Sequence, residues 1–340
     1  MYKEIGSEFW LEEPVPQPMA DRDGVYTLSG RTAIDVILQE VLCTRKVRVV
    51  RMPAWCCDSM IAPFVSRGVD IKFYDKGCTD TPENFCDFSD FSENILYVTN
   101  YFGYENTIPL ETVKHFKEKG AIILYDMTHS FLMDDDPYLA VADYNFASIR
   151  KWMGVIGGAV VEGVHDVVLK HCSYLEPKET AMRMKQAYME GDDSVDKQEF
   201  LKLYGEFGHH LSEDYCDYAM DDLSYAIYKA TDFEAMKAQR RANAKYLHEN
   251  LKGVKFMYEL TDKVVPLFVP VLFENKEQRD AVRRKLIEAE IYCPIHWPKP
   301  PQIPANFEAN KIYDTELSLI CDQRYDLTDM ARIVKQINNL

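Results

Sequence analysis

Short apolar runs alternate with segments of helical spacing through the first half of the chain. Four segments predict strands, at residues 46–52, 70–74, 94–99 and 121–125. Between them, apolar residues three and four positions apart predict helices at 59–66 and 110–119. Strands that alternate with helices are typical of a mostly parallel sheet covered by helices on both faces. We therefore expect an α/β fold for this half of the chain.

The second half carries a different pattern. Residues 165–215 are charged, and we expect the His209–His210 pair there to lie on a solvated loop rather than at a metal site. Residues 218–251 have the apolar spacing of one long helix. The remaining elements predict a smaller α+β unit, with strands at 264–273 and 291–293 and helices at 276–290 and 327–337.

A chain of 340 residues is long enough to bury a sizeable core and to form two domains. We expect an N-terminal arm and a large domain in residues 1–240, and a small C-terminal α+β domain in residues 241–340. The first 27 residues are rich in proline and acidic groups, which predicts an irregular arm that packs on the body or on a partner.

Composition and charge narrow the classes of function. The net charge of -16 disfavours nucleic acid and anionic membranes as partners, because both would repel such a surface. No apolar run reaches the roughly 18 residues of a membrane-spanning helix, and the acidic N-terminus lacks a secretory signal. Nine scattered cysteines form neither a disulfide framework nor a zinc spacing. We expect a cytoplasmic protein without a metal that acts on small molecules.

Candidate chemistry gathers between residues 121 and 161. The apolar run 121–125 ends on Asp126, and Lys151 follows later with Ser148 three positions before it. A lysine in a desolvated pocket has a lowered pKa and can form a Schiff base with an aldehyde cofactor. A carboxylate at the end of a buried strand can keep a pyridine nitrogen protonated. This combination indicates a pyridoxal phosphate (PLP) site, with Ser148 turned toward the cofactor phosphate.

Each of these residues also has an ordinary structural interpretation. An aspartate after an apolar strand is often a turn former or a helix N-cap. An Arg-Lys pair is usually exposed, although the apolar residues Ile149, Trp152 and Met153 disfavour full exposure here. The combination, rather than any one residue, favours the cofactor site.

A helix is predicted to begin near Ser29, since residues 33, 34, 37 and 38 are apolar. A glycine-containing turn at a helix N-terminus offers free backbone N–H groups and the positive end of the helix dipole to an anion. We therefore predict that Gly30, Arg31 and Thr32 bind the cofactor phosphate. A serine-capped helix without any ligand is the alternative.

Three segments follow predicted strands and should meet at one edge of the sheet. They are Pro53–Cys57, Asn100–Tyr101 and Asp126. Trp55 is our candidate to stack on the pyridine ring, because a flat aromatic face suits a flat heteroaromatic ring.

The same segments resemble the fold-type-I PLP-dependent aminotransferases, and among them the DegT/DnrJ/StrS sugar aminotransferases. The resemblance is carried by Ser29–Ala33, Pro53–Trp55, Asn100–Gly103, Asp126–His129, Ser148–Lys151 with Gly157–Gly158, and Pro294–Trp297. It implies an aspartate-aminotransferase-like large domain with a mostly parallel sheet and a smaller α+β C-terminal domain. It also implies ping-pong transfer of an amino group from an amino acid, with glutamate expected, to a keto acceptor such as a keto-sugar nucleotide. Lys151 would then be the Schiff-base lysine and proton shuttle.

The resemblance also suggests how the ring is held. The family's stacking aromatic stands about two places beyond Trp55, where this chain has Cys57, so Trp55, Cys57 and Tyr101 all stay candidates to cover the ring. His129 stands where the family usually carries glutamine, and is expected to donate to the cofactor's phenolic oxygen.

A second departure concerns the hydroxyl before the lysine. The family tends to place it five positions upstream, where this chain has Phe146, whereas Ser148 is three positions upstream.

The resemblance further implies a homodimer with shared active sites, in which Ser224 lies near the partner's phosphate. His296 and Trp297 would close over the cleft, and Arg324 would clamp the donor carboxylate by a bidentate pair, or serve only as a structural arginine. Two other functions stay open: a PLP-dependent lyase-type enzyme, because one constellation can labilise several bonds, and a non-catalytic binding or regulatory protein with this fold.

Overall fold

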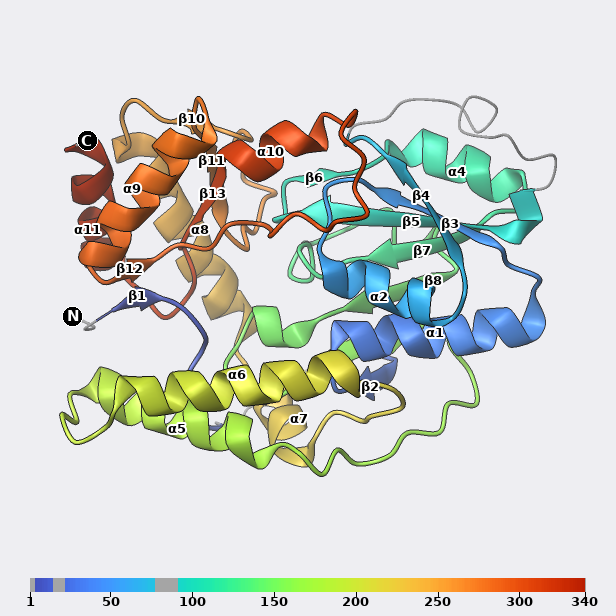
Figure 1. Cartoon of the computed structure of the whole chain (residues 1–340), viewed down its shortest axis with the longest axis horizontal. Helices are drawn as coiled ribbons and strands as arrows, with labels where there is room; N and C mark the ends of the chain where they lie inside the picture. The colour runs from blue at the N-terminus through green and yellow to red at the C-terminus, as the bar shows by residue number, and fades with distance from the viewer. Residues whose placement is uncertain (1–3, 15–21, 77–90, 340) are drawn as a thin grey trace.

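A computed structural model describes residues 4–14, 22–76 and 91–339 (Figure 1). Two regions of secondary structure stand side by side, a large one around the main sheet and a smaller one that carries the C-terminus. Residues 1–3 and 15–21 of the expected arm lie outside the described residues.

The main sheet has the order β2-β9-β8-β7-β5-β3-β4 in the described residues, with β6 paired to β5. Its strands are β2 (Val25–Thr27), β3 (Val49–Pro53), β4 (Asp70–Tyr74), β5 (Asn94–Tyr101), β6 (Glu105–Asn106), β7 (Ile122–Asp126), β8 (Tyr144–Ala147) and β9 (Ala159–Glu162). The five strands from β4 to β8 along this order pair in parallel, and β9 and β2 are antiparallel to their neighbours. The predicted α/β fold with a mostly parallel sheet is confirmed.

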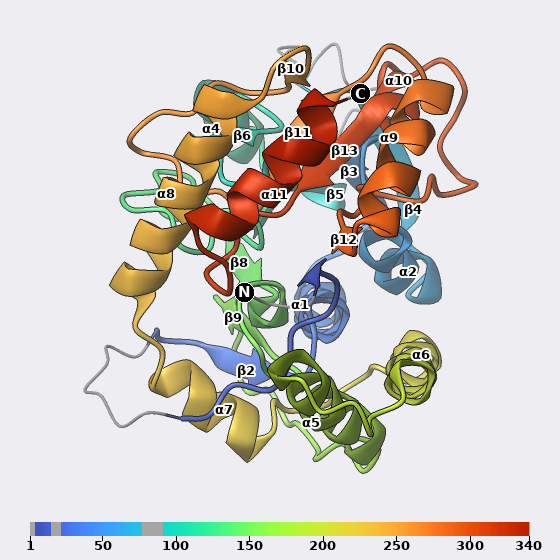
Figure 2. The same cartoon turned by 90° about the vertical axis from the view of Figure 1, so that its left-hand side faces the viewer.

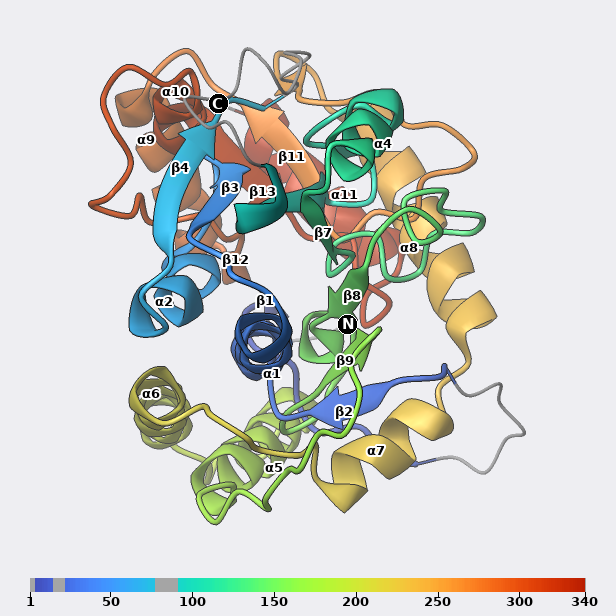
Figure 3. The same cartoon turned by 90° about the vertical axis from the view of Figure 1, so that its right-hand side faces the viewer.

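Helices cover this sheet and extend beyond it. They are α1 (Gly30–Thr44), α2 (Asp58–Ser66), α4 (Leu110–Glu118), α5 (Glu176–Glu190), α6 (Lys197–Glu213), α7 (Asp222–Lys229) and α8 (Phe233–Asn250), with short 3-10 turns η1 (Phe91–Glu93) and η2 (Ile149–Lys151). Figure 3 shows α5 and α6 side by side beneath α1. The strands β5 and β7 are buried along their whole length, as expected for central strands of a parallel sheet.

The smaller region is built on a three-stranded antiparallel sheet, β10 (Lys255–Phe256), β11 (Val269–Leu272) and β13 (Glu316–Leu319). Its other elements are α9 (Lys276–Glu288), β12 (Ile291–Tyr292), α10 (Ala309–Thr315) and α11 (Leu327–Asn338). It has its own buried apolar cluster, to which Val271, Leu319 and Ile333 contribute. The expected boundary between residues 240 and 241 falls inside α8, and the division into two domains stays a prediction.

Three sequence predictions were wrong in this half. Residues 218–251 form two helices, because Asp232 caps a new helix by accepting a hydrogen bond from the Ala235 N–H. His209 and His210 lie within α6 rather than on a loop. The predicted strand 264–273 is limited to β11, because Arg240 and Arg241 donate to the carbonyl groups of residues 264, 266 and 267 instead.

The described part of the arm is more regular than expected. β1 (Ile5–Gly6) pairs with β12, and β2 joins the main sheet. Lys185 on α5 donates to the carbonyl oxygens of Gly6 and Glu8, and Lys197 on α6 pairs with Glu4. Figure 2 shows β1 lying between these helices and the smaller region. Residues 4–9 therefore pack on the body of the same chain.

Among the described residues, we find no helix that is both long and apolar enough to span a membrane.

Candidate functional site

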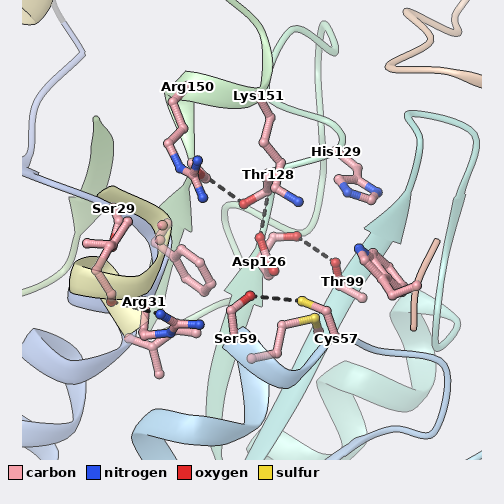
Figure 4. Close-up of a pocket in the computed structure, with 18 of the residues that line it drawn as sticks. Ser29, Arg31, Cys57, Ser59, Thr99, Asp126, Thr128, His129, Arg150 and Lys151 are labelled. Carbon is pink, nitrogen blue, oxygen red and sulfur yellow. Dashed lines mark hydrogen bonds between the residues drawn. The ribbon is translucent and has the colours of Figure 1, made fainter. Parts of the chain in front are cut away.

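A pocket opens beyond the carboxyl ends of β5, β7 and β8, against the N-terminus of α1 (Figure 4). Asp126 ends β7, and Ser148 and Lys151 follow β8, so the parallel topology brings these side chains to one edge of the sheet. Figure 4 shows Arg31 and Arg150 on one side of the pocket and His129 on the other, with Lys151 and Asp126 between them.

Asp126 is buried at the floor of this pocket. Its Oδ2 accepts a hydrogen bond from the Tyr97 hydroxyl at 2.7 Å, and its Oδ1 accepts one from the Thr128 N–H at 2.9 Å. Burial raises the pKa of the Asp126 carboxyl, whereas the donors on Thr128 and Tyr97 and the charge of Lys151 act in the opposite direction. Two hydrogen bonds thus fix the position of the carboxyl, and its raised pKa favours a hydrogen bond to a further proton-bearing group.

Lys151 lies in the η2 turn and faces two hollows. One is the pocket that also holds Asp126, and the other lies between η2, residues 7–9 of the arm and the smaller region. A flexible amine at the junction of two hollows can reach a group bound in either one.

His129 is buried on the wall opposite the arginines. Its Nδ1 accepts a hydrogen bond from the Phe102 N–H at 3.2 Å, which assigns the ring proton to Nε2. Its ring stacks on Phe102 and Trp297, with centroids 4.9 Å and 5.8 Å away. Burial and the charge of Lys151 hold the pKa of His129 well below its usual range, so the side chain is a neutral N–H donor.

The N-terminus of α1 forms the other end of the pocket. Ser29 caps the helix, since its Oγ accepts a hydrogen bond from the Thr32 N–H at 3.2 Å and lies 2.9 Å from the Thr32 hydroxyl. Thr32 is therefore buried and engaged by Ser29 instead of lining the pocket. A Cβ at Gly30 would lie 3.2 Å from Ser148 Cβ, so glycine leaves room for the serine beside the helix end.

Two guanidinium groups border this end of the pocket. Arg31 donates from Nη1 to the Leu211 carbonyl at 2.8 Å and lies over the Tyr215 ring. In the part of the chain that the structure describes, the Nε atoms of Arg31 and Arg150 are buried without a hydrogen-bond partner. Burial, together with the charge of Arg150, lowers the pKa of Arg31. Two unpaired donors close to each other fit an anion.

A buried lysine from α5 completes the positive charge here. Lys178 Nζ lies 3.0 Å from Oε2 of Glu8 on the arm. The charge of Lys178 holds the pKa of Glu8 at about 2 against desolvation, with a further contribution from Arg150. Glu8 lines both hollows, so the arm contributes a carboxylate at their junction.

Trp55, Cys57 and Tyr101 were the candidates to cover a bound ring. Among the described residues that line the pocket, Cys57 is present and the other two are not. Its Sγ lies 3.0 Å from Ser59 Oγ. Trp55 is fully buried behind the pocket, where its Nε1 donates to the His296 carbonyl at 2.6 Å. Tyr101 packs on Trp55 at a centroid distance of 4.3 Å and donates its hydroxyl to the Trp55 carbonyl. Trp55 and Tyr101 therefore support the wall.

Two other predicted residues are engaged elsewhere. The Ser224 hydroxyl is buried and accepts hydrogen bonds from the N–H groups of Ile156 and Gly157 at 3.0 Å and 3.4 Å. Arg324 forms a bidentate pair with Asp322, at 2.9 Å and 2.8 Å, and also donates to the Glu8 carbonyl. Its guanidinium thus anchors the arm, which leaves it little capacity to clamp a substrate carboxylate.

His296 lines the second hollow together with Lys151 and Phe268.

Sequence reasoning selected His296 but missed Arg150, Lys178 and Glu8. Arg150 could have been found, because it stands next to the predicted Schiff-base lysine and the apolar residues around the pair disfavour full exposure. Lys178 and Glu8 carry no local signal, since only the fold brings α5 and the arm together.

No protein-family profile matches the sequence, and no curated protein is significantly similar to it. Solved structures are similar in fold. NtdA from Bacillus subtilis, crystallised with the cofactor PMP, matches with a TM-score of 0.65 and 16% identity over 94% of this chain and 73% of its own. The chain shares the fold of the sugar aminotransferases.

Two further structures agree. Spr1654 from Streptococcus pneumoniae, assigned as a sugar aminotransferase, has a TM-score of 0.64 at 14% identity and covers 93% of this chain and 85% of its own. A DegT DnrJ EryC1 StrS aminotransferase from Brucella abortus has a TM-score of 0.60 at 14% identity, with the same coverage of 93% and 85%. The resemblance inferred from the sequence motifs is thus confirmed at the level of the fold.

Proposed function

We propose that this protein is a PLP-dependent aminotransferase. The observation that carries the proposal is that Lys151 and Asp126 face one pocket whose far end combines a helix N-terminus with two guanidinium groups whose buried Nε atoms have no hydrogen-bond partner in the described residues. The residues present fit the cofactor. A phosphate would satisfy the buried Nε atoms of Arg31 and Arg150, and Gly30 keeps the helix end open.

Bound PLP supplies an aldehyde that bonds an amine and a ring that stabilises negative charge on the neighbouring carbon. Lys151 offers the amine and, once an amino donor has displaced it, accepts and returns the proton at the substrate carbon. Asp126 would pair with the protonated pyridine nitrogen, whose positive charge would counter the burial that raises the pKa of this carboxyl. His129 donates its Nε2 proton at the phenolic oxygen.

The phosphate would be held by Arg31, Arg150, the Ser148 hydroxyl and the first N–H groups of α1. Charge-assisted hydrogen bonds of this kind are shorter and roughly twice as strong as neutral ones. Cys57 lines the pocket where the resemblance expects an aromatic residue, so we assign the cover of the ring to Cys57.

For substrates, we propose an amino acid donor, with glutamate first, and a keto acceptor of the keto-sugar nucleotide class. The similarity in fold to sugar aminotransferases supports this class. We also propose a cytoplasmic homodimer with a large domain in residues 1–240 and a small domain in residues 241–340. Because the Ser224 hydroxyl accepts the N–H groups of Ile156 and Gly157, we propose the dimer without assigning Ser224 to the partner's site.

The proposal is tested in two steps. The purified protein is incubated with PLP and reduced with borohydride, and peptide mapping is expected to find the added mass on Lys151. A separate sample that is loaded with PLP but not reduced should release about one equivalent of 2-oxoglutarate per site in a single-turnover incubation with L-glutamate. A protein that carries the adduct but deaminates no amino acid would be a binding protein, and an adduct on another lysine would refute the site.

A further inference from the structure

Three buried side chains form a continuous hydrogen-bonded chain that ends at the second hollow. Glu316 and Ser318 lie two positions apart on β13, and so on the same face of the strand. Ser318 Oγ lies 2.5 Å from Glu316 Oε1 and 2.8 Å from His296 Nδ1. The other carboxyl oxygen, Oε2, accepts the His296 backbone N–H at 2.8 Å. The backbone bond fixes which oxygen of Glu316 faces Ser318.

His296 connects this chain to the site. It lines the same hollow as Lys151, and its ring is held between Phe102 and Phe268 with centroids 5.0 Å and 4.9 Å away. Burial and the charge of Lys151 hold the pKa of His296 well below its usual range, so the ring is neutral. Since Nδ1 is occupied by Ser318, Nε2 is the nitrogen left to face the hollow.

The protonation state of Glu316 determines whether Nε2 of His296 presents an N–H group or a lone pair to the hollow. When the carboxyl is protonated, Glu316 donates to Ser318, Ser318 donates to Nδ1, and the His296 proton must be on Nε2. When the carboxyl is ionised, Ser318 donates to Glu316 and accepts from Nδ1, so Nε2 carries a lone pair instead. Both arrangements use the same three distances and differ only in the direction of the hydrogen bonds.

Burial raises the pKa of Glu316 to about 8, whereas the donors on Ser318 and His296 and the charge of Arg279 oppose the shift. Arg279 is nearby because its Nη1 donates to the Glu316 carbonyl at 2.9 Å. The other titratable groups that sense Glu316 are Tyr258 and Cys293, whose pKa values are raised mainly by burial. The Glu316 carboxyl is therefore mostly protonated at neutral pH, and it can lose and regain its proton at a pH only slightly above neutral.

We propose that Glu316, Ser318 and His296 form a proton relay that serves the substrate oxygen beside Lys151. The relay deepens the proposed transamination, in which a keto oxygen of the acceptor must leave as water. The Nε2–H bond of His296 breaks as one O–H bond of this water forms, and the amine that attacks the keto carbon supplies the other proton of the water. Nδ1 takes the proton of Ser318 Oγ, and Ser318 takes that of Glu316, which is left as a carboxylate. The half-reaction that consumes water returns one proton to Glu316 by the reverse path.

The first test needs no cofactor. Long-range 1H–15N spectra of the cofactor-free protein labelled in its histidines report which ring nitrogen carries the proton, and His296→Gln identifies the signal. We expect His296 to change from the Nε2–H to the Nδ1–H form as pH rises through about 8. His129 should keep its Nε2–H form throughout, because the Phe102 N–H fixes it. A His296 tautomer that is the same at about pH 6.5 and about pH 9.5 would overturn the relay.

The His296 tautomer in three variants distinguishes a proton relay from a purely structural role of these side chains. In Glu316→Gln, the amide oxygen must accept the His296 N–H, so the amide N–H points at Ser318 and should lock the Nε2–H form at every pH. Ser318→Ala should uncouple the His296 tautomer from Glu316, and Ser318→Thr should restore the coupling. Glu288→Gln on the exposed side of α9 is the matched control and should behave as wild type. A Glu316→Gln protein that still changes tautomer near pH 8 contradicts the proposal.

A second readout uses the loaded enzyme. Wild-type kcat should fall as pH rises through about 8, where Glu316 loses its proton. Glu316→Gln should lower kcat about tenfold and remove this limb of the profile. If no adduct forms on Lys151, the proposed function fails while the tautomer measurement still decides the relay. If transamination is found with identical profiles in both proteins, the relay fails alone.

Discussion

Arg150→Met should weaken PLP binding through the phosphate alone. Methionine keeps an unbranched stem next to Lys151 but removes the guanidinium, whose Nε is buried without a partner in the described residues. A hydrogen bond from a charged donor contributes about 1.5–3 kcal/mol. Loss of about 3 kcal/mol corresponds to a roughly hundredfold higher Kd for PLP. Arg31 remains to hold the phosphate, so binding should be weakened rather than abolished.

Pyridoxal provides the control, because it has the ring and the aldehyde but no phosphate. We would measure Kd for PLP and for pyridoxal by equilibrium dialysis with wild type, Arg150→Met and Arg183→Met. Arg183 lies on the exposed face of α5 and makes only exposed ion pairs, so its replacement should change neither Kd. A loss of less than about threefold for PLP, or an equal loss for pyridoxal, would show that Arg150 does not bind the phosphate.

The other predictions concern four positions. Lys151→Ala should abolish the borohydride-stable adduct and lower turnover by several orders of magnitude, measured by mass spectrometry and 2-oxoglutarate release. Asp126→Asn should lower turnover far more than bound PLP, measured as cofactor per chain, because the pyridine nitrogen then loses the carboxylate that keeps it protonated. Glu8→Gln should tighten PLP binding a few-fold by removing a carboxylate near Arg150, with exposed Glu13→Gln as the unaffected control. Glu316 has a folded pKa of about 8 against 4.5, so the stability of wild type relative to Glu316→Gln should be highest below about pH 4.5 and fall by up to about 5 kcal/mol as pH rises through 8. Urea unfolding near pH 5 and pH 9 would show this difference, and parallel curves would refute the buried neutral carboxyl.

Much of the central sheet could be predicted from the sequence, because β3, β5 and β7 are buried along their whole length. The predicted strand 70–74 coincides with β4, and the run 121–125 differs from β7 by one residue. Asp126 was found for the same reason, because it ends the apolar run 121–125. Lys151 was selected from its spacing to Ser148 and from the resemblance, whereas the strand β8 before it was not predicted. Their roles stay predictions until the variants are measured.

What the sequence could not show depends on contacts between distant segments. Nothing near Arg324 indicates that Asp322 and the arm occupy its guanidinium. The burial of Trp55 depends on the carbonyl of His296, far along the chain, which accepts the indole N–H of Trp55. The relay is hidden for the same reason, because Glu316 and Ser318 read as one polar face of a short strand until His296 is placed against them.

The arm and the α5–α6 pair supply contacts that hold the charged groups of the proposed phosphate site in place. Leu211 of α6 fixes Arg31 through its carbonyl, and Lys178 of α5 pairs with Glu8 at the rim. The hydroxyl of Ser224, which the resemblance assigned to a partner's phosphate, instead supports the backbone after η2. If these contacts supply the phosphate site, the Kd for PLP should not depend on protein concentration, even across a dimer-to-monomer transition followed by light scattering. A Kd that rises when the dimer dissociates would instead assign part of the site to the second copy.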